Sequence, residues 1–260
     1  AMRNLAASTA TVGGSEPRRG RVADDDTPAL GRTEAESKTG RYYKLGDHVL
    51  YCGKLVEPGT LKNFDVAQAD MTFARFAQEE RFKDSYLDVF LGHALANTEG
   101  VIYLATTLDR LAHVQSRFQA LDGHWSTTLM AYEPKRTGRK GEVYRDVVLP
   151  VVYGWRSEAK HFFYGGRDKS NLVPLTAAAP KGDVPVELVV FVMQNSSRPG
   201  DTVLDVHVSQ GATVIAAEKT GRKLIGYVQS ARELDRVRHR WTRFVHGDKA
   251  DWRTKTGEIT

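Results

Sequence analysis

One stretch of the chain, residues 195–218, has the order of features that most constrains the fold. A turn signal, Arg198-Pro199-Gly200-Asp201, precedes a short apolar strand that ends in an acid, Asp205. A loop then leads to a helix that we expect to begin near Ala212. In an open α/β sheet, a strand ending in an acid before a helix N-terminus holds a nucleotide-like ligand. The stretch therefore predicts an α/β sheet with a ligand crevice at the carboxyl end of this strand.

Apolar patterns predict alternating strands and helices over most of the chain. Strands are expected at residues 48–51, 64–73, 100–105, 125–132, 147–153, 202–205 and 224–228. Helices are expected at residues 84–96, 108–121, 186–193, from about 212, and 231–246. This alternation predicts a mainly parallel sheet with helices on both faces.

Composition divides the chain into three regions. Residues 1–40 are small, polar and charged, so we expect a disordered N-terminal arm. Residues 41–248 are expected to form one domain, and residues 249–260 a C-terminal tail. No apolar run is long enough to span a membrane, and the N-terminus lacks the apolar block of a signal peptide. We therefore expect an intracellular protein.

The loop after Asp205 resembles the cofactor-binding segment of the DNA methyltransferases that methylate the amino group of adenine (N6) or cytosine (N4). In that family the segment reads Asp-Pro-Phe-x-Gly-x-Gly-Thr and wraps S-adenosylmethionine. Asp205 and Gly211 match this pattern. The residues that depart from it are Val206 for Pro, His207 for Phe, Ser209 for the first Gly and Ala212 for Thr.

The resemblance covers roughly residues 44–246. It is carried by residues 45–53, 150–155, 161–170, 185–188 and 218–226. Of these, 150–155 and 161–170 are similar to a segment common in phage and prophage members. The order of regions is that of the β-type arrangement, with the catalytic region first, a target-recognition segment at about 133–146 next, and the cofactor loop last. The resemblance implies a Rossmann-like, S-adenosylmethionine-dependent methyltransferase fold and a phage-encoded origin.

The catalytic region departs most from the family. In the family, the strand aligned with residues 69–74 runs into Asp-Pro-Pro-Tyr, which binds the target amino group and stacks on the flipped base. Here the four residues are Arg75, Phe76, Ala77 and Gln78. An arginine offers only hydrogen-bond donors and repels a positive sulfur. Phe76 either supplies a stacking ring in a shifted register or belongs to the core. We therefore assign no catalytic residue.

The cofactor loop has also lost residues with which the family binds its ligand. Ser209 adds a Cβ where a glycine lets the backbone approach a ligand, and β-branched Val206 and Val208 stiffen the loop. Gln229 stands where family members have an acid for the ribose hydroxyls. His207 is either a new ligand or base, or a packed or solvated side chain. The residues of this vestigial cofactor site are Asp205, Ser209, Gly211, Thr213 and Gln229. No cofactor is expected unless the protein is an active enzyme, which would need S-adenosylmethionine.

A net charge of +5 and a pI of about 9.2 are compatible with a polyanionic partner. The residues that we expect to contact the phosphates of double-stranded DNA are Lys135, Arg136, Arg139, Lys140, Arg145, Arg167 and Lys169. The arginines of the last helix are either a second DNA contact or a solvated face, and its apolar stripe (Leu234, Val237, Trp241, Phe244) is either core or a subunit interface. One cysteine and scattered histidines predict no metal site.

These features leave three hypotheses. The framework is retained while three ligand-binding positions have changed, which favours a catalytically degenerate methyltransferase homologue. Such a protein would bind DNA, a partner, or both, as a homodimer or as a heterodimer with an active methyltransferase. The second hypothesis is an active N6-adenine methyltransferase with relocated catalytic groups. The third is a structural or regulatory subunit that binds protein and not DNA.

Overall fold

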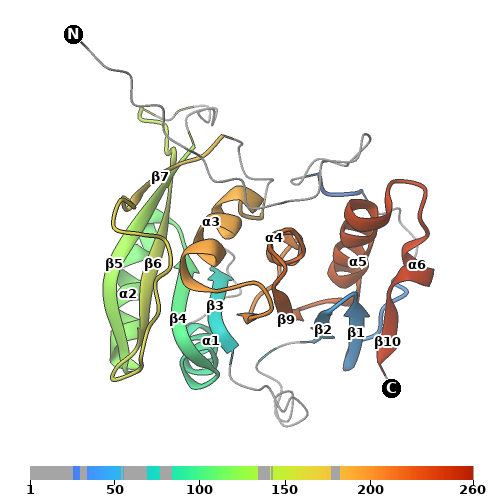
Figure 1. Cartoon of the computed structure of the whole chain (residues 1–260), viewed down its shortest axis with the longest axis horizontal. Helices are drawn as coiled ribbons and strands as arrows, with labels where there is room; N and C mark the ends of the chain where they lie inside the picture. Colours follow the sequence, from blue (N-terminus) through green and yellow to red (C-terminus); the bar gives the residue numbers. More distant parts are fainter. Residues whose placement is uncertain are drawn as a thin grey trace.

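The computed structural model describes residues 26–29, 34–53, 55, 69–76, 84–133, 141, 143–176 and 182–259. Within these residues, ten strands form one sheet in the order β10-β1-β2-β9-β8-β3-β4-β6-β5-β7 (Figure 1). The strands are β1 (Arg41–Leu45), β2 (His48–Cys52), β3 (Ala69–Arg75), β4 (Thr98–Ala105), β5 (Gly123–Tyr132), β6 (Val148–Arg156), β7 (Leu172–Pro174), β8 (Thr202–Asp205), β9 (Lys223–Val228) and β10 (Gly257–Ile259). The helices are α1 (Asp84–Ala96), the 3-10 turn η1 (Leu108–Arg110), α2 (Leu111–Ala120), α3 (Val186–Ser196), α4 (Ala212–Thr220), α5 (Ala231–His246) and α6 (Trp252–Lys255).

The centre of the sheet is parallel and its edges are mixed. Strands β2, β9, β8, β3 and β4 run in the same direction. On one side β6 pairs antiparallel with β4, β5 pairs antiparallel with β6, and β7 runs parallel to β5. On the other side β1 and β10 are antiparallel additions. The predicted α/β fold is confirmed, with antiparallel pairing confined to the flanks.

Helices cover both faces of the sheet. One apolar core includes Val189 of α3, Val214 of α4 and Val237 of α5, whereas the other includes Leu91 of α1 and Val114 of α2. Successive residues of a central strand point to opposite faces and are buried on both, as expected for a parallel sheet between two helical layers. Figure 1 shows α3, α4 and α5 along one face. No helix among the described residues is long and apolar enough to cross a membrane.

The chain leaves two neighbouring central strands towards opposite faces. Strand β8 leads to α4 on one face, and its parallel neighbour β3 is followed along the chain by α1 on the other. The carboxyl ends of β8 and β3 therefore form a topological switch point, where open α/β sheets bind ligands. Asp205 is the last residue of β8 and Arg75 the last residue of β3.

Part of the region predicted as a disordered arm is docked on α5. The Ser37 amide and hydroxyl donate to Asp235 Oδ1 at 2.9 and 2.6 Å, and Arg238 Nη1 donates to the Ser37 hydroxyl at 2.8 Å. Ser37 is buried by these contacts. The ordered fold therefore begins before residue 41, because a buried polar cluster holds this segment. Most of residues 1–33 lie outside the described part of the chain.

The predicted C-terminal tail also belongs to the fold. Its strand β10 pairs with β1 at the edge of the sheet, and Trp252 of α6 is buried. The Arg238 guanidinium lies 4.5 Å from the centre of the Trp252 ring, and its Nε donates to Thr256 Oγ1 at 2.8 Å. The boundary predicted at residue 248 is thus too early, because the last residues add a strand and an aromatic anchor.

Candidate functional site

The acid predicted at the end of β8 is buried and points into its own loop. Asp205 Oδ2 accepts from the Thr213 hydroxyl at 2.6 Å, and Oδ1 accepts from the His207 amide at 2.8 Å. Burial raises the pKa of Asp205 to about 7, the two hydrogen bonds offset part of that rise, and the nearby Asp183 adds to it. The carboxyl group therefore anchors the loop, and it carries only part of a negative charge near neutral pH.

The side chain of His207 crosses the switch point. Its Nδ1 lies 3.0 Å from the carbonyl oxygen of Arg75, so the carbonyl accepts and Nδ1 carries the hydrogen. Its ring lies edge-on to Phe90 of α1, with centroids 6.1 Å apart. Of the alternatives for His207, the geometry supports packing: the ring joins the loop after β8 to the end of β3.

The two valines of the loop are buried on opposite faces of the sheet. Val206 belongs to the core under α1, and Val208 to the core under α4 and α5. Val208 lies so close to Gly226 of β9 that a Cβ on Gly226 would come within 2.4 Å of Val208 Cγ2. The Val208 amide also donates to the carbonyl of Tyr227 at 2.9 Å. The loop thus folds down onto the ends of β8 and β9.

A buried ion pair holds the other end of the loop. Arg240 Nη1 of α5 donates to Asp183 Oδ2 at 2.8 Å and to the Gln210 carbonyl at 2.9 Å. The Ser209 hydroxyl donates to the Gly182 carbonyl at 2.6 Å. Gly211 then starts α4 with φ of 95°, a conformation that favours glycine. The predicted loop residues are therefore brought together, and every one makes contacts within the protein.

The sequence reasoning did not identify Asp183, and it assigned Arg240 to a charged face. Arg240 is almost completely buried, which its pairing with Asp183 permits. Its spacing was the available signal, because Arg240 lies three residues after Val237 and four before Phe244 of the apolar stripe. The stripe itself (Leu234, Val237, Trp241, Phe244) is buried in the core.

Gln229, at the position expected for a ribose-binding acid, is engaged elsewhere. Its Nε2 donates to the Tyr86 hydroxyl of α1 at 2.7 Å. Burial raises the pKa of Tyr86 to about 12, so this hydroxyl stays protonated and accepts the amide hydrogen. The contact ties the end of β9 to α1.

Two of the four residues at the catalytic position are described. Arg75 is partly exposed at the end of β3, and Phe76 is buried with its ring edge-on to Phe90 at 5.6 Å between centroids. The burial supports the core interpretation of Phe76. Ala77 and Gln78 lie outside the described residues.

The residues predicted to contact DNA fall into two groups. Arg145, Arg167 and Lys169 are exposed on the segments before β6 and between β6 and β7, and Lys169 pairs with Asp168 at 3.2 Å. Lys135, Arg136, Arg139 and Lys140 lie outside the described residues.

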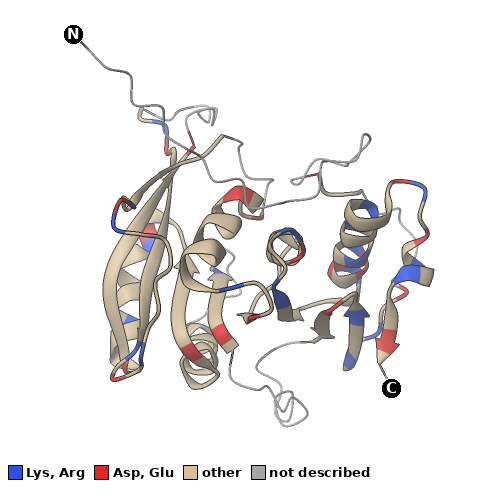
Figure 2. Cartoon of the chain, viewed as in Figure 1, with Lys and Arg blue, Asp and Glu red and all other residues tan. Residues whose placement is uncertain are grey.

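The last helix carries both signs of charge, and Figure 2 shows basic and acidic residues interspersed along α5 and the segment after it. Arg238 and Arg240 are buried, and Arg243 pairs with Asp248 at 2.7 Å. These three arginines are therefore engaged within the protein, whereas Arg232 is exposed and Arg236 half-buried, so the DNA-contact alternative for α5 stays a prediction for those two residues.

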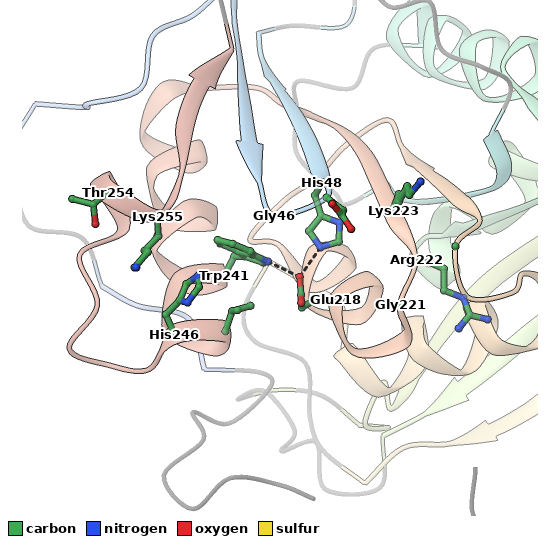
Figure 3. A pocket seen from close by; sticks show the side chains of 13 residues that line it. Gly46, His48, Glu218, Gly221, Arg222, Lys223, Trp241, His246, Thr254 and Lys255 are labelled. Carbon is green, nitrogen blue, oxygen red and sulfur yellow. Dashed lines mark hydrogen bonds and ion pairs between the residues drawn. The ribbon is translucent and has the colours of Figure 1, made fainter. Parts of the chain in front are cut away.

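A hollow of about 590 Å³ lies at the amino-terminal end of β9, at the other end of the strand from the loop that follows Asp205 (Figure 3). Glu218 Oε2 there accepts from Trp241 Nε1 at 2.9 Å and from His48 Nε2 at 3.0 Å. His48 Nδ1 accepts from the Leu224 amide at 3.1 Å, so Nε2 carries the hydrogen that Glu218 accepts. These hydrogen bonds lower the pKa of Glu218 and lock β2, α4 and α5 together.

Among the described residues, no group of three or more His, Cys, Asp or Glu side chains could hold a metal ion.

A sequence model of the DNA methylase family (N6/N4 type) matches residues 97–237, which is more than half of the chain. The chain belongs to the N6/N4 DNA methylase family. No curated protein matches it significantly in sequence.

Solved structures of similar fold include M1.HpyAVI in complex with SAM (TM-score 0.63, 16% identity, covering 74% of this chain and 98% of that one). PvuII DNA methyltransferase, which is cytosine-N4-specific, gives a TM-score of 0.61 at 15% identity over 81% of this chain and 98% of that one. TTHA0409 of Thermus thermophilus, a proposed DNA modification methylase complexed with S-adenosyl-L-methionine, gives 0.59 at 17% identity over 77% and 96%. These likenesses confirm the methyltransferase-like fold of this N6/N4 DNA methylase family member.

The described residues of this methylase-family protein do not fit S-adenosylmethionine in the way that the family's cofactor motif implies. Both oxygens of Asp205 accept hydrogen bonds from its own loop and helix. The His207 ring spans the crevice, and Val208 covers Gly226. A ligand at the carboxyl ends of β8 and β9 would have to displace these contacts. We therefore derive no methyl-transfer step from this site.

Proposed function

We propose that this member of the N6/N4 DNA methylase family does not transfer methyl groups and binds duplex DNA, alone or with a partner protein. The observation that carries the proposal is the hydrogen bond between His207 and the Arg75 carbonyl, which closes the switch-point crevice from within. Arg75 also stands where the family has an acid. An arginine offers no acceptor to the amino group of a target base.

Exposed cations support the DNA-binding part of the proposal. Arg145, Arg167 and Lys169 flank the β5–β6–β7 side of the sheet, and their side chains are accessible to a phosphate backbone. Contacts of this kind release counterions, so the affinity falls with salt in proportion to the number of phosphates bound. The overall net charge of +5 acts in the same direction.

Two measurements on the full chain test the proposal. Isothermal titration with S-adenosylmethionine is expected to give no saturable heat, and labelled S-adenosylmethionine is expected to leave no methyl group on DNA. Fluorescence anisotropy with a labelled duplex is expected to show binding that weakens steeply with salt. Replacing Arg145, Arg167 or Lys169 with alanine should each lower the salt slope by about 1. Lys223 is an exposed cation at the amino-terminal end of β9, away from these three residues. Lys223→Ala is therefore the matched control and should leave the slope unchanged.

Family membership favours one competing function, the S-adenosylmethionine-dependent methylation of an amino group in DNA, for which we take N6 of adenine as the alternative. Methyl transfer by the pure protein, abolished by Asp205→Ala, would establish that function and end our proposal. Absence of DNA binding even at low salt would instead leave a subunit that binds only protein. Size-exclusion chromatography with light scattering then separates a self-associating chain from one that needs a different partner.

A further inference from the structure

A cavity of about 320 Å³ lies between α3, the strands β4, β5 and β6, and the segment that follows β6. Aromatic side chains form much of its wall, among them Tyr153, Trp155, Phe163 and Phe191. Trp155 is stacked on His161, with ring centroids 3.7 Å apart and an angle of 13° between the planes. Stacking of this kind fixes the orientation of the indole. The cavity therefore has flat, preformed apolar walls.

Two polar groups of the lining have no hydrogen-bond partner among the described residues. The side-chain amide of Asn195 makes no such bond, although the residue is only 6% exposed. The Tyr153 hydroxyl likewise makes none. Neither group is among the side-chain atoms that are fully buried without a partner in the described part of the chain, so the polar atoms of both keep accessible surface. Asn195 offers both a donor and an acceptor to whatever occupies the cavity.

This cavity is separate from the loop after β8. Helix α3 begins with Val186, close in sequence to Asp183, which Arg240 links to that loop. Asn195 is in the last turn of the same helix. At about 1.5 Å per residue, the two ends lie roughly 14 Å apart along the helix axis. The cavity thus lies at the far end of α3 from the predicted cofactor site.

The segment that lines one side of the cavity is basic and aromatic. Residues 156–170 contain four cationic side chains (Arg156, Lys160, Arg167 and Lys169) and two acidic ones (Glu158 and Asp168). Lys169 itself lines the cavity. Beside it, the exposed rings of Phe162 and Tyr164 lie nearly parallel, and the Arg198 guanidinium is 4.6 Å from the centre of the Tyr164 ring. Basic residues interleaved with exposed aromatic rings are typical of surfaces that bind unpaired nucleotides.

We propose that this cavity binds a nucleobase, with its ring against the aromatic walls, its polar edge on the Asn195 amide and its phosphate near Lys169. Each of the four DNA bases has neighbouring donor and acceptor atoms on one edge, which an asparagine amide can match. The volume is at the lower end of the range for ligand pockets, which suits a single heterocycle. The same chemistry is offered by a free mononucleotide and by an unstacked base in DNA. The proposal does not depend on whether the protein transfers methyl groups or binds duplex DNA.

Binding is measured on the full chain by tryptophan fluorescence quenching and by isothermal titration. The probes are dAMP, dTMP, a short single-stranded oligonucleotide, and an abasic oligonucleotide of the same length. The wild-type protein is expected to bind a base-bearing probe at least tenfold more tightly than the abasic one. Saturation by the mononucleotides identifies a free nucleotide as sufficient, whereas binding of the base-bearing oligonucleotide alone identifies an unstacked base in DNA.

Asn195→Asp keeps the shape of the side chain and removes its donor, and it is expected to weaken base-dependent binding about tenfold. Trp155→Phe tests the aromatic wall with little change in packing. Trp125→Ala is the control, because Trp125 is exposed on β5 and does not line the cavity. Thermal melting of each variant confirms that it is folded. Equal affinity for base-bearing and abasic probes, no binding of any probe, or wild-type affinity in folded Asn195→Asp and Trp155→Phe would each overturn the proposal.

Discussion

The Nδ1 of His207 lies 3.0 Å from the carbonyl oxygen of Arg75, so a side chain on one side of the switch-point crevice is bonded to the backbone on the other. The two residues are 132 positions apart in sequence. In a sheet that binds a ligand at this point, the crevice is open and the ligand supplies the bridge. Here the protein supplies the bridge itself, with a side chain from the loop after β8.

His207→Ala is expected to reduce the free energy of unfolding by about 1 kcal/mol, because one hydrogen bond and an edge-on ring contact are lost. His207→Asn is the matched control, since its amide can still donate to the Arg75 carbonyl. Urea unfolding of both variants measures the difference. Equal stability of the alanine and wild-type proteins would mean that the bridge does not hold the loop.

Asp205 is expected to make stability depend on pH. Its pKa is about 7 in the folded protein and 3.8 as the ordinary value, so between these values the folded state binds more protons than the unfolded state. The contribution is therefore fully present below about pH 4, is lost as pH rises to about 7, and stays lost above that.

Asp205→Asn removes this titration and still offers an acceptor to Thr213 or to the His207 amide. Relative to wild type, the variant is expected to gain about 2–3 kcal/mol between pH 5 and pH 8. Urea unfolding of both proteins at the two pH values gives the number. A constant difference at pH 5 and pH 8 would contradict a raised pKa for Asp205.

Arg240→Ala is expected to cost about 3–5 kcal/mol, because it leaves the buried carboxylate of Asp183 without its partner and frees the Gln210 carbonyl. Replacing Arg240 and Asp183 together with leucine should restore much of the loss, since neither charge then stays buried alone. Arg243→Ala, whose ion pair with Asp248 is exposed, is the control and should cost less than about 1 kcal/mol. A similar loss of unfolding free energy in Arg240→Ala and Arg243→Ala would show that the buried Arg240–Asp183 pair does not hold the loop in place.

Local patterns predicted the elements that local interactions form. The predicted helices at residues 84–96 and 231–246 coincide with α1 and α5. For α5, the Glu233 amide donates to the Ser230 hydroxyl, a cap that involves only neighbouring residues. The predicted helix at residues 108–121 instead begins with a 3-10 turn before α2. The strand ending at Asp205 was also predicted, because it is a short apolar run that directly follows a turn signal.

Contacts between distant residues could not be predicted in this way. Nothing near His207 indicates that its ring meets Arg75, and nothing near Arg240 indicates Asp183 as its partner. The sequence placed the changed loop correctly in the fold, yet whether it forms an open or a filled crevice depends on side chains from β3, α1 and α5. Strand β10 has only three residues and no apolar run, so its pairing with β1 left no periodic signal.

The last prediction concerns this C-terminal segment, where Trp252 packs against the guanidinium of Arg238. Trp252→Ala is expected to cost about 3–5 kcal/mol, as for other buried aromatic residues, and to loosen β10 from β1. An unpaired β1 is an exposed edge strand, so the variant should also self-associate as its concentration rises. Urea unfolding and light scattering measure the two effects, with exposed Trp125→Ala as the control. If Trp252→Ala were as stable and as monodisperse as the control, residues 252–259 would be the separable tail that composition alone predicts.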